Sequence, residues 1–332
     1  MTADKNELEA LDPSTAIRLY LDHKSTDCTK STVQNHRYRL NAFIEWCDQQ
    51  SIDNLNDLSG RDIQKYRLWR GENDDINKLT LRMQMSTLRV FLKWAASMEA
   101  VPENLYTKVM VPRVQRSQRQ RDEMLEAEDA KAILQHLSTY EYASTPHLLL
   151  ALLWETGIRM GAANGIDLRD VDLDEEYIHL IHRPDEGTTL KNGQSGERLI
   201  AITPELTGLI GDHIKAKRHD VTDDHGREPL LTTEYGRMCR TTIRRVVYRI
   251  TAPCYRKLTC PDCNSGSEEK CPDAVSPHAI RRGSITHYLT EDIPVEIVSD
   301  RMNVSRKVLD EHYDERSQEV KMEQRRNYLD DI

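Results

Sequence analysis

The stretch HAIRRGSITHYLTEDIPVEIVSDRMNVSRKVLDEHY, residues 278–313, carries the most informative side chains of this chain. It begins with His278 and Arg281, whose spacing places both on one face of a helix. There they can bind a single small anion, such as a phosphate diester. It ends at Tyr313, whose hydroxyl can act as a nucleophile. Because His-x-x-Arg also occurs by chance, the remaining sequence decides whether these residues form a site.

Length and composition favour a large two-domain protein that does not cross a membrane. The chain has 332 residues, and no apolar run approaches the roughly 20 residues that span a bilayer. The first residues, MTADKNELEA, are polar and acidic, so a cytoplasmic location is expected. The net charge of −9 argues mildly against a nucleic-acid partner. Arg outnumbers Lys about two to one, however, and the spread of acidic residues suits a protein that stays solvated at high salt.

Residues 1–111 predict a helical domain with basic faces. Apolar residues recur at helical spacing after Pro13, after Ser31 and after the capping-box pattern Ser59-x-x-Asp62. A fourth helix carries Leu81 to Ala95. The opposite faces hold cations that would either be solvated or contact DNA phosphates. The candidate DNA contacts are Lys30, Arg37, Arg82 and Arg89, with Arg240 and Arg244 in the second domain.

Residues 112–123, which include VQRSQRQRDE, lack apolar periodicity and predict a linker. From residue 124 a second domain follows, with helices over 125–137, 147–166, 204–217 and 241–250. The apolar helix 147–166 is broken at Thr156-Gly157. Residues 177–183 and the alternating stretch that ends at 202 predict a small antiparallel sheet, with Lys191 near its turn.

The segment WETGIRMGAANGIDLRDVDL, residues 154–173, is similar to the TGLR-x-x-E-L-x-x-L motif of tyrosine site-specific recombinases, the phage-integrase and Xer-type family. That family carries an Arg in this motif, a Lys in a β-hairpin, a later His-x-x-Arg, and a Tyr 32 residues beyond the second Arg. SPHAIRRGSITHYL resembles its HxLRHTFATHLL, and 32 residues separate Arg281 from Tyr313. The chain thus resembles a salt-adapted, archaeal-type member with a cysteine-rich insertion.

The resemblance implies a mainly α fold with a small antiparallel β-sheet. A helical SAM-like core-binding domain would precede an α+β catalytic domain, residues 124–332. Its catalytic residues would be Arg159, Lys191, His278, Arg281 and Tyr313. The two arginines would bind the non-bridging oxygens of the phosphate, and Tyr313 would attack phosphorus. His278 would bind the phosphate or accept the tyrosine proton, and Lys191 would protonate the leaving 5′-oxygen.

The implied activity is DNA cleavage and rejoining through a 3′-phosphotyrosine bond, without ATP or a catalytic metal. Double-stranded DNA is the implied partner, with a homotetramer on DNA and a monomer when free. The alternative is a DNA-binding protein of the same fold with weak or lost cleavage. Type IB topoisomerase action is a variant of the first activity.

Three positions depart from the family pattern. Val304, in MNVS, replaces the His or Trp that the family carries in LGHS, nine residues before the tyrosine. Ala162 replaces an acidic residue, and Arg282 stands where His is common. Because these are supporting positions, we expect reduced or altered activity before none.

Each assignment has a simpler competitor. Arg159 could cap a buried helix, and His278 could be a core histidine. Lys215 and Lys217 compete with Lys191. Tyr288 and Tyr328 compete with Tyr313, although neither has the spacing of 32.

The insertion, residues 254–271, holds four of the seven cysteines: Cys254, Cys260, Cys263 and Cys271. Cys260-x-x-Cys263 allows two thiolates to share one ion, and the flanking pair could complete a tetrahedral zinc site. Such an ion would stabilise a loop too polar to fold alone. An iron–sulfur cluster and thiols without a metal are the alternatives.

Overall fold

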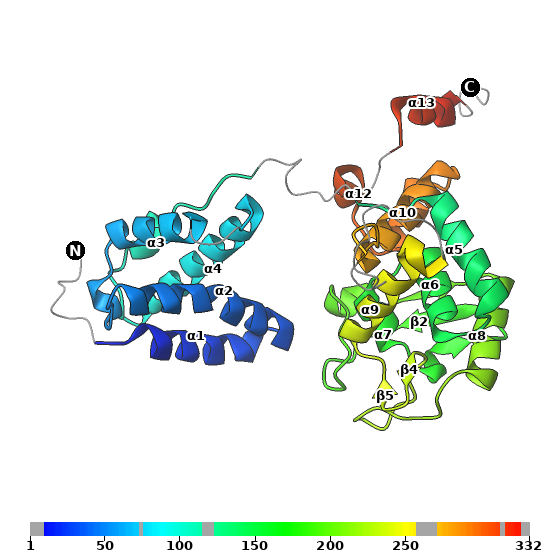
Figure 1. Ribbon diagram of the computed structural model, residues 1–332, viewed down its shortest axis with the longest axis horizontal. Coiled ribbons are helices and arrows are strands. Elements are labelled where there is room, and N and C mark those ends of the chain that lie inside the picture. The colour runs from blue at the N-terminus through cyan, green and yellow to red at the C-terminus, as the bar shows by residue number, and fades with distance from the viewer. Residues whose placement is uncertain (1–9, 73–75, 115–122, 257–270, 313–315, 327–332) are drawn as a thin grey trace. The chain divides into compact units, whose positions relative to one another are not determined.

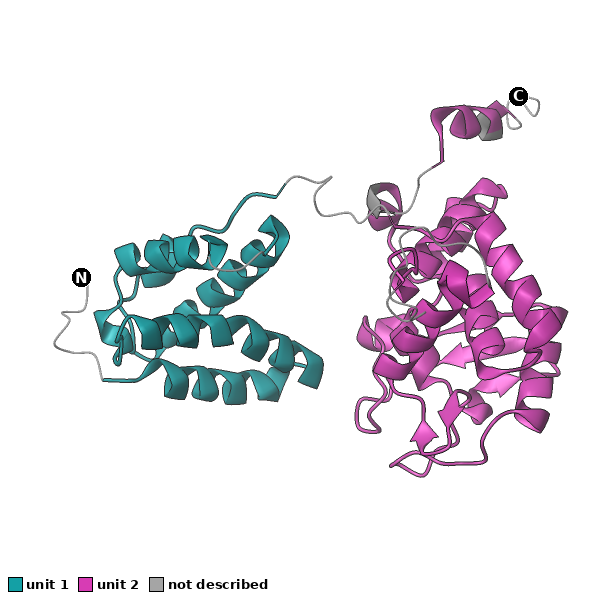
Figure 2. Ribbon diagram, in the orientation of Figure 1, with its two compact units in different colours: residues 1–121 teal, residues 122–332 magenta. Residues whose placement is uncertain are grey.

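The computed structural model describes residues 10–72, 76–114, 123–256, 271–312 and 316–326. The chain divides into two compact units, residues 1–121 and 122–332 (Figure 2). Helices dominate both units, and short antiparallel strands occur in the second (Figure 1). This is the mainly α fold with a small antiparallel sheet that the sequence predicts.

The first unit is a helical domain with an aromatic core. Its α-helices are α1 (Pro13–Asp27), α2 (Lys30–Gln49), α3 (Gly60–Glu72) and α4 (Lys78–Ser97), and its short 3-10 helices are η2 (Leu55–Asp57) and η3 (Leu105–Lys108). Tyr20, Phe43, Trp46, Tyr66 and Phe91 are at most 2% exposed and come from all four α-helices. Between different helices these rings pack edge to face, as Phe43 and Tyr66 do with their centroids 5.2 Å apart, so the aromatic contacts hold the four helices together.

Side-chain caps define where these helices begin. At α3 the main-chain N–H of Ser59 donates to Asp62 Oδ2 at 3.1 Å, and that of Asp62 donates to Ser59 Oγ at 3.4 Å. This reciprocal pair confirms the predicted capping box. The predicted cap at Ser31 is wrong, because α2 begins earlier. Thr29 is its N-cap and accepts from the Thr32 N–H at 3.4 Å.

The second unit is built around α6 (Thr145–Thr156), which packs against α5 (Ala127–Tyr140), α8 (Pro204–Ala216), α9 (Arg240–Thr251) and α10 (Pro277–Thr290). Leucines occupy nearly every side of α6 and are almost wholly buried, as a central helix requires. The remaining helical elements are α7 (Met160–Gly165), η4 (Leu168–Asp170), η5 (Gly193–Gly196), η6 (Pro253–Arg256), α11 (Val295–Arg301), α12 (Arg306–His312) and α13 (Gln318–Arg326).

A three-stranded antiparallel sheet has the order β1 (Val171–Asp172), β2 (Tyr177–Leu180) and β3 (Arg198–Ala201). Ile178 pairs with Ile200, so both apolar side chains face the core. The β2–β3 pair is the predicted hairpin, and Lys191 lies in its connection. The sequence does not predict β1 or the two-residue strands β4 (Thr232–Thr233) and β5 (Gly236–Arg237).

A network of arginines and carboxylates closes the base of this hairpin. Arg183 donates to Asp170 Oδ2 at 2.9 Å, and Arg227 donates to Thr188 Oγ1 at 3.0 Å. Arg237 donates to Asp223 at 2.9 Å. Burial alone would raise the pKa of Asp223, but hydrogen bonds from the Arg227 main chain and the Arg237 side chain outweigh it and lower that pKa. These ion pairs are largely buried and anchor the hairpin to the core.

Among the described residues, no helix is both long enough and apolar enough to cross a membrane.

Candidate active site

The predicted site begins at the turn between α6 and α7. Gly157 ends α6 in the left-handed conformation, with φ 58°, and its N–H donates to the Leu153 carbonyl at 3.1 Å. A Cβ at Gly157 would lie 2.7 Å from Met302 Sδ, so the end of α11 packs directly on this turn. Arg159 follows as the half-buried N-cap of α7, and Nη1 of its guanidinium donates to the Asn303 carbonyl at 3.3 Å.

Arg281, on α10, holds the same turn from the other side. Its side chain is only 1% exposed. Nη1 donates to the Gly157 carbonyl at 2.5 Å, and Nη2 donates to the Met302 carbonyl at 2.7 Å. The guanidinium therefore ties α10 to the α6–α7 turn and to the end of α11.

His278 lies at the first turn of α10, where its side chain is partly covered and partly exposed. The protein packed around the ring disfavours the charged form, and this lowers the pKa of His278. Neighbouring positive charges lower it further; they belong to Arg281, Arg282, Arg159 and Lys191. The four predicted catalytic residues that the structure describes therefore lie near one another, although they come from three separate stretches of the chain.

Lys191 is exposed in the β2–β3 connection. The residues that follow it contact the turn between α11 and α12: Asn192 Nδ2 donates to Asn303 Oδ1 at 2.9 Å, and Asn303 Nδ2 donates to the Ser195 carbonyl at 3.3 Å. Its predicted competitors, Lys215 and Lys217, are also exposed, but they lie at the end of α8. The charge of Lys191 is the lysine charge that acts on His278.

Arg198 is a further cation of the site that the sequence does not single out. It begins β3, and its Nε donates to the Arg301 carbonyl at 2.7 Å while Nη1 donates to the Gly196 carbonyl at 2.9 Å. Burial, followed by repulsion from the charge of Arg159, lowers its pKa to about 10. Only its place in an alternating strand next to Lys191 could have indicated it.

The three residues that depart from the family pattern are all buried. Val304 is 5% exposed and packs with Ile285, Leu289, Val298, Met302 and Leu309. Its side chain thus belongs to an apolar cluster. Ala162 and Arg282 are buried as well, at 9% and 4% exposure. Tyr313 lies outside the described residues; α12 ends at His312.

The candidate DNA contacts fall into two groups. Lys30 and Arg37 are exposed on α2, and Arg244 is exposed on α9. The others are engaged with main-chain carbonyls: Arg82 donates to Pro112 at 2.8 Å, Arg89 to Val109, and Arg240 to Thr189 at 3.4 Å. Arg82 and Arg89 therefore fix the segment after η3 against α4, in addition to carrying positive charge.

Of the four insertion cysteines, Cys260 and Cys263 lie outside the described residues. Cys254 and Cys271 come together, with their sulfur atoms 3.8 Å apart. In the described part of the chain, no group of three or more His, Cys, Asp or Glu side chains is arranged to hold a metal ion.

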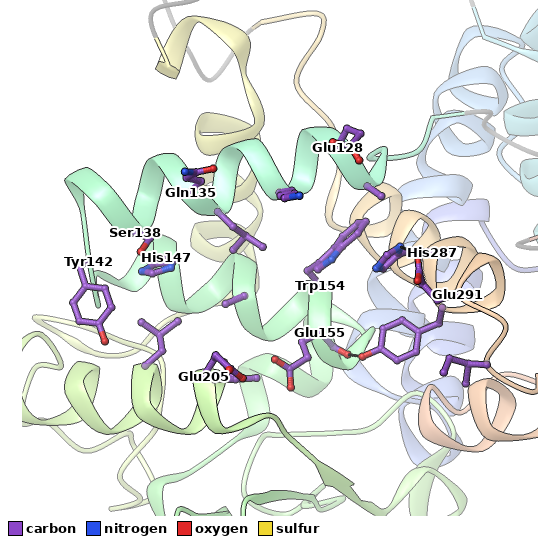
Figure 3. Close-up of a pocket in the computed structure, with 18 residues that line it drawn as sticks. Glu128, Gln135, Ser138, Tyr142, His147, Trp154, Glu155, Glu205, His287 and Glu291 are labelled. Carbon is purple, nitrogen blue, oxygen red and sulfur yellow. Dashed lines mark hydrogen bonds and ion pairs between the residues drawn. The ribbon is translucent and has the colours of Figure 1, made fainter.

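A groove of about 1050 Å³ lies elsewhere on the second unit, between α5, α6, α8 and α10 (Figure 3). Trp154 stacks on His287 along it, with ring centroids 5.6 Å apart, and Tyr288 donates to the Glu155 carbonyl at 2.6 Å. None of the described catalytic candidates lines this groove.

Comparison with known proteins identifies both units. Residues 17–99 match the family described as phage integrase, N-terminal SAM-like domain, and residues 123–318 match the phage integrase family. A probable integrase/recombinase protein of Methanocaldococcus jannaschii is 22% identical over 307 residues, which cover 89% of this chain and 86% of that protein.

Solved structures share the fold. An integrase of the transposon Tn1549, in complex with transposon right end DNA, is 16% identical, with a TM-score of 0.67, 97% of this chain covered and 99% of that one. A lambda integrase dimer bound to a core site is 14% identical, with a TM-score of 0.65, 92% of this chain covered and 78% of that one. Since the family match alone spans more than half of its residues, the chain belongs to the phage integrase family.

Proposed function

We propose that the protein is a site-specific DNA recombinase or integrase that cuts and rejoins DNA through a 3′-phosphotyrosine intermediate, without ATP or a catalytic metal. The main support is that Arg159, Arg281 and the residue after Lys191 all bind the neighbouring turns at Gly157 and Asn303, although they lie far apart in the sequence. Fixed cations around one point would stabilise the charge that develops on a phosphate during its transfer.

In the proposed reaction Tyr313 forms a bond from its oxygen to phosphorus, and the bond from phosphorus to the 5′-oxygen breaks. Lys191 gives a proton to the leaving 5′-oxygen, and His278 accepts the tyrosine proton. The lowered pKa of His278 keeps its ring in the neutral form, which is the form that can accept a proton. Arg159 and Arg281 bind the non-bridging oxygens. The covalent ester conserves the energy of the broken bond, so a 5′-hydroxyl of a second strand can reverse the step.

Double-stranded DNA is the proposed partner, with a monomer in free solution and a homotetramer on DNA. The relatives' complexes with transposon-end and core-site DNA support the first part. The excess of Arg over Lys and the net charge of −9 support adaptation to high salt, so assays belong at raised ionic strength.

Trapping on DNA tests the proposal. The protein is incubated with nicked suicide DNA that carries the repeats flanking its own gene, and covalent adducts are sought on a denaturing gel. Tyr313→Phe should abolish the adduct. The matched control, Tyr288→Phe, removes a hydroxyl that donates to the Glu155 carbonyl and should keep it.

The second candidate is a DNA-binding protein of this fold with little cleavage, favoured by the apolar surroundings of Val304 and by Ala162. Tight and specific binding of intact DNA without any adduct would establish it in place of the recombinase.

We also propose that the insertion binds one structural zinc ion through Cys254, Cys260, Cys263 and Cys271. The support is the 3.8 Å between the sulfurs of Cys254 and Cys271. Two thiolates bound about 2.3 Å from one tetrahedral zinc lie about 3.8 Å apart. The ion would stabilise the insertion without taking part in catalysis.

A further inference from the structure

Asn303 lies in the turn between α11 and α12 and joins two parts of the site. Its Oδ1 accepts from Asn192 Nδ2 at 2.9 Å, and its Nδ2 donates to the Ser195 carbonyl at 3.3 Å. Its own main-chain carbonyl accepts from Arg159 Nη1 at 3.3 Å. One residue therefore connects residues 191–196, here called the Lys191 loop, to the arginine at the start of α7.

Close packing of Asn303 against the Lys191 loop accompanies these hydrogen bonds. A Cβ added at Gly196 would lie 3.2 Å from Asn303 Nδ2 and 3.3 Å from Leu190 Cβ, so the amide rests directly on the end of the Lys191 loop. Asn192, which follows Lys191 directly, donates a hydrogen bond to the same amide. The side chain thus contacts the loop near both of its ends.

The backbone of Asn303 adds a second kind of evidence. Its φ is 47°, in the left-handed region, where a side chain costs free energy and glycine does not. Asparagine tolerates this region better than most residues. Its contacts with Asn192 and Ser195 are ones that a glycine could not make, and they offset this cost.

We propose that Asn303 positions Lys191. It holds the Lys191 loop in one place relative to Arg159, so that the ammonium group meets the leaving 5′-oxygen of a phosphate held by the arginines. Val304, buried next to it, has no polar group to offer, and Asn303 supplies the polar contacts of this turn. The inference rests on the proposed function, in which Lys191 is the general acid. Asn303 itself does not touch the reacting atoms.

The test uses Asn303→Gly in the full chain, which keeps the carbonyl for Arg159 and removes only the amide. Cleavage is timed on two suicide substrates, one with the ordinary phosphate and one with sulfur in place of the bridging 5′-oxygen. A thiol has a pKa of about 8.5, so a thiolate leaves without a proton. Loss of positioning should slow the ordinary substrate on the order of 10-fold to 100-fold and leave the sulfur substrate near the wild-type rate.

Glu176→Gly is the matched control, because Glu176 also has a left-handed backbone, with φ 53°, but lies in the β1–β2 turn. It should cleave both substrates like the wild type. Asn303→Gly at the wild-type rate on ordinary phosphate, or equally slow on both substrates, would overturn the proposal.

Hydrogen exchange separates this inference from the proposed function, because it needs no cleavage. Asn303→Gly should speed exchange of amides in the Lys191 loop and leave β4 and β5 unchanged, while Glu176→Gly should leave the loop unchanged. Unaltered exchange in the loop refutes the positioning role. If the wild type forms no adduct on either substrate, the proposed function fails, and the exchange result still decides whether Asn303 holds the loop.

Discussion

Arg281 and Gly157 are joined by a hydrogen bond of 2.5 Å from a buried guanidinium to the carbonyl that ends α6. A catalytic candidate is thus also part of the packing. Arg159, in contrast, is half-buried and has a 3.3 Å bond to the Asn303 carbonyl. The two arginines, to which the proposal gives the same chemical task, should differ in what they contribute to stability.

Arg281→Ala should abolish cleavage and lower the free energy of unfolding by roughly 2–4 kcal/mol, because two buried carbonyls lose their donor. Arg159→Ala should abolish cleavage at a cost of about 1 kcal/mol or less. Urea unfolding, followed together with adduct formation, checks both. Equal stability losses in the two variants would contradict the structural role of Arg281.

The pKa of His278 should be measurable below the ordinary value of about 6.5. Its neutral form is favoured in the folded state, so its contribution to stability is complete above the unfolded pKa and is lost as pH falls towards the folded one. An NMR titration of free protein, with His278→Gln to assign the signal, should show a midpoint under 6.5. A midpoint above that value would mean that the surrounding cations do not act on the ring.

Freshly purified, reduced protein should contain one zinc ion per chain by elemental analysis. Cys254→Ser and Cys271→Ser should each lose most of it, because a tetrahedral site needs all four ligands. Cys28→Ser, a change outside the insertion, is the control and should retain the metal. Metal-free wild-type protein would end the zinc proposal without affecting the catalytic one.

The exposed and the engaged cations of the first unit should respond differently to substitution. Lys30→Ala and Arg37→Ala should each weaken DNA binding and reduce the slope of log affinity against log salt by about 1. Arg82→Ala should chiefly lower the stability of that unit, since Arg82 donates to the Pro112 carbonyl at 2.8 Å. Binding titrations at several salt concentrations, with thermal unfolding alongside, distinguish the two effects. An unchanged slope in Lys30→Ala would remove that residue from the DNA interface.

Much of the fold could be predicted because its signals are local. Helical periodicity, the Ser59–Asp62 capping box and the Gly157 break each act over a few residues. The strands β1, β4 and β5 have two residues each, too few for any alternation to appear. Thr29 and Ser31 are both good caps, and sequence alone does not say which hydroxyl faces the open N–H groups.

The site residues could be predicted only where the sequence resembles the motifs of the family. The His-x-x-Arg motif indicates a phosphate-binding role for Arg281, but it does not indicate that Arg281 also binds the Gly157 and Met302 carbonyls. Asn192 and Asn303 are 111 residues apart, and Arg198 and Arg301 are 103 apart, so their contacts depend on the completed fold. For the same reason Val304 could be identified as a missing polar group next to Asn303, but the contacts of Asn303 with Asn192 and Ser195 could not be predicted.

The ion pairs at the base of the β2–β3 hairpin should respond to salt differently from exposed charges. Mobile ions screen charges over about 8 Å at 0.15 M and about 3 Å at 1 M, but they act far less on buried pairs. Asp167 and Asp223 are 1% and 8% exposed at their side chains, and they pair with Arg227 and Arg237. A salt concentration that weakens exposed contacts with DNA phosphates would leave these buried ion pairs intact. Raised ionic strength should therefore weaken the proposed DNA contacts while the base of the hairpin stays anchored.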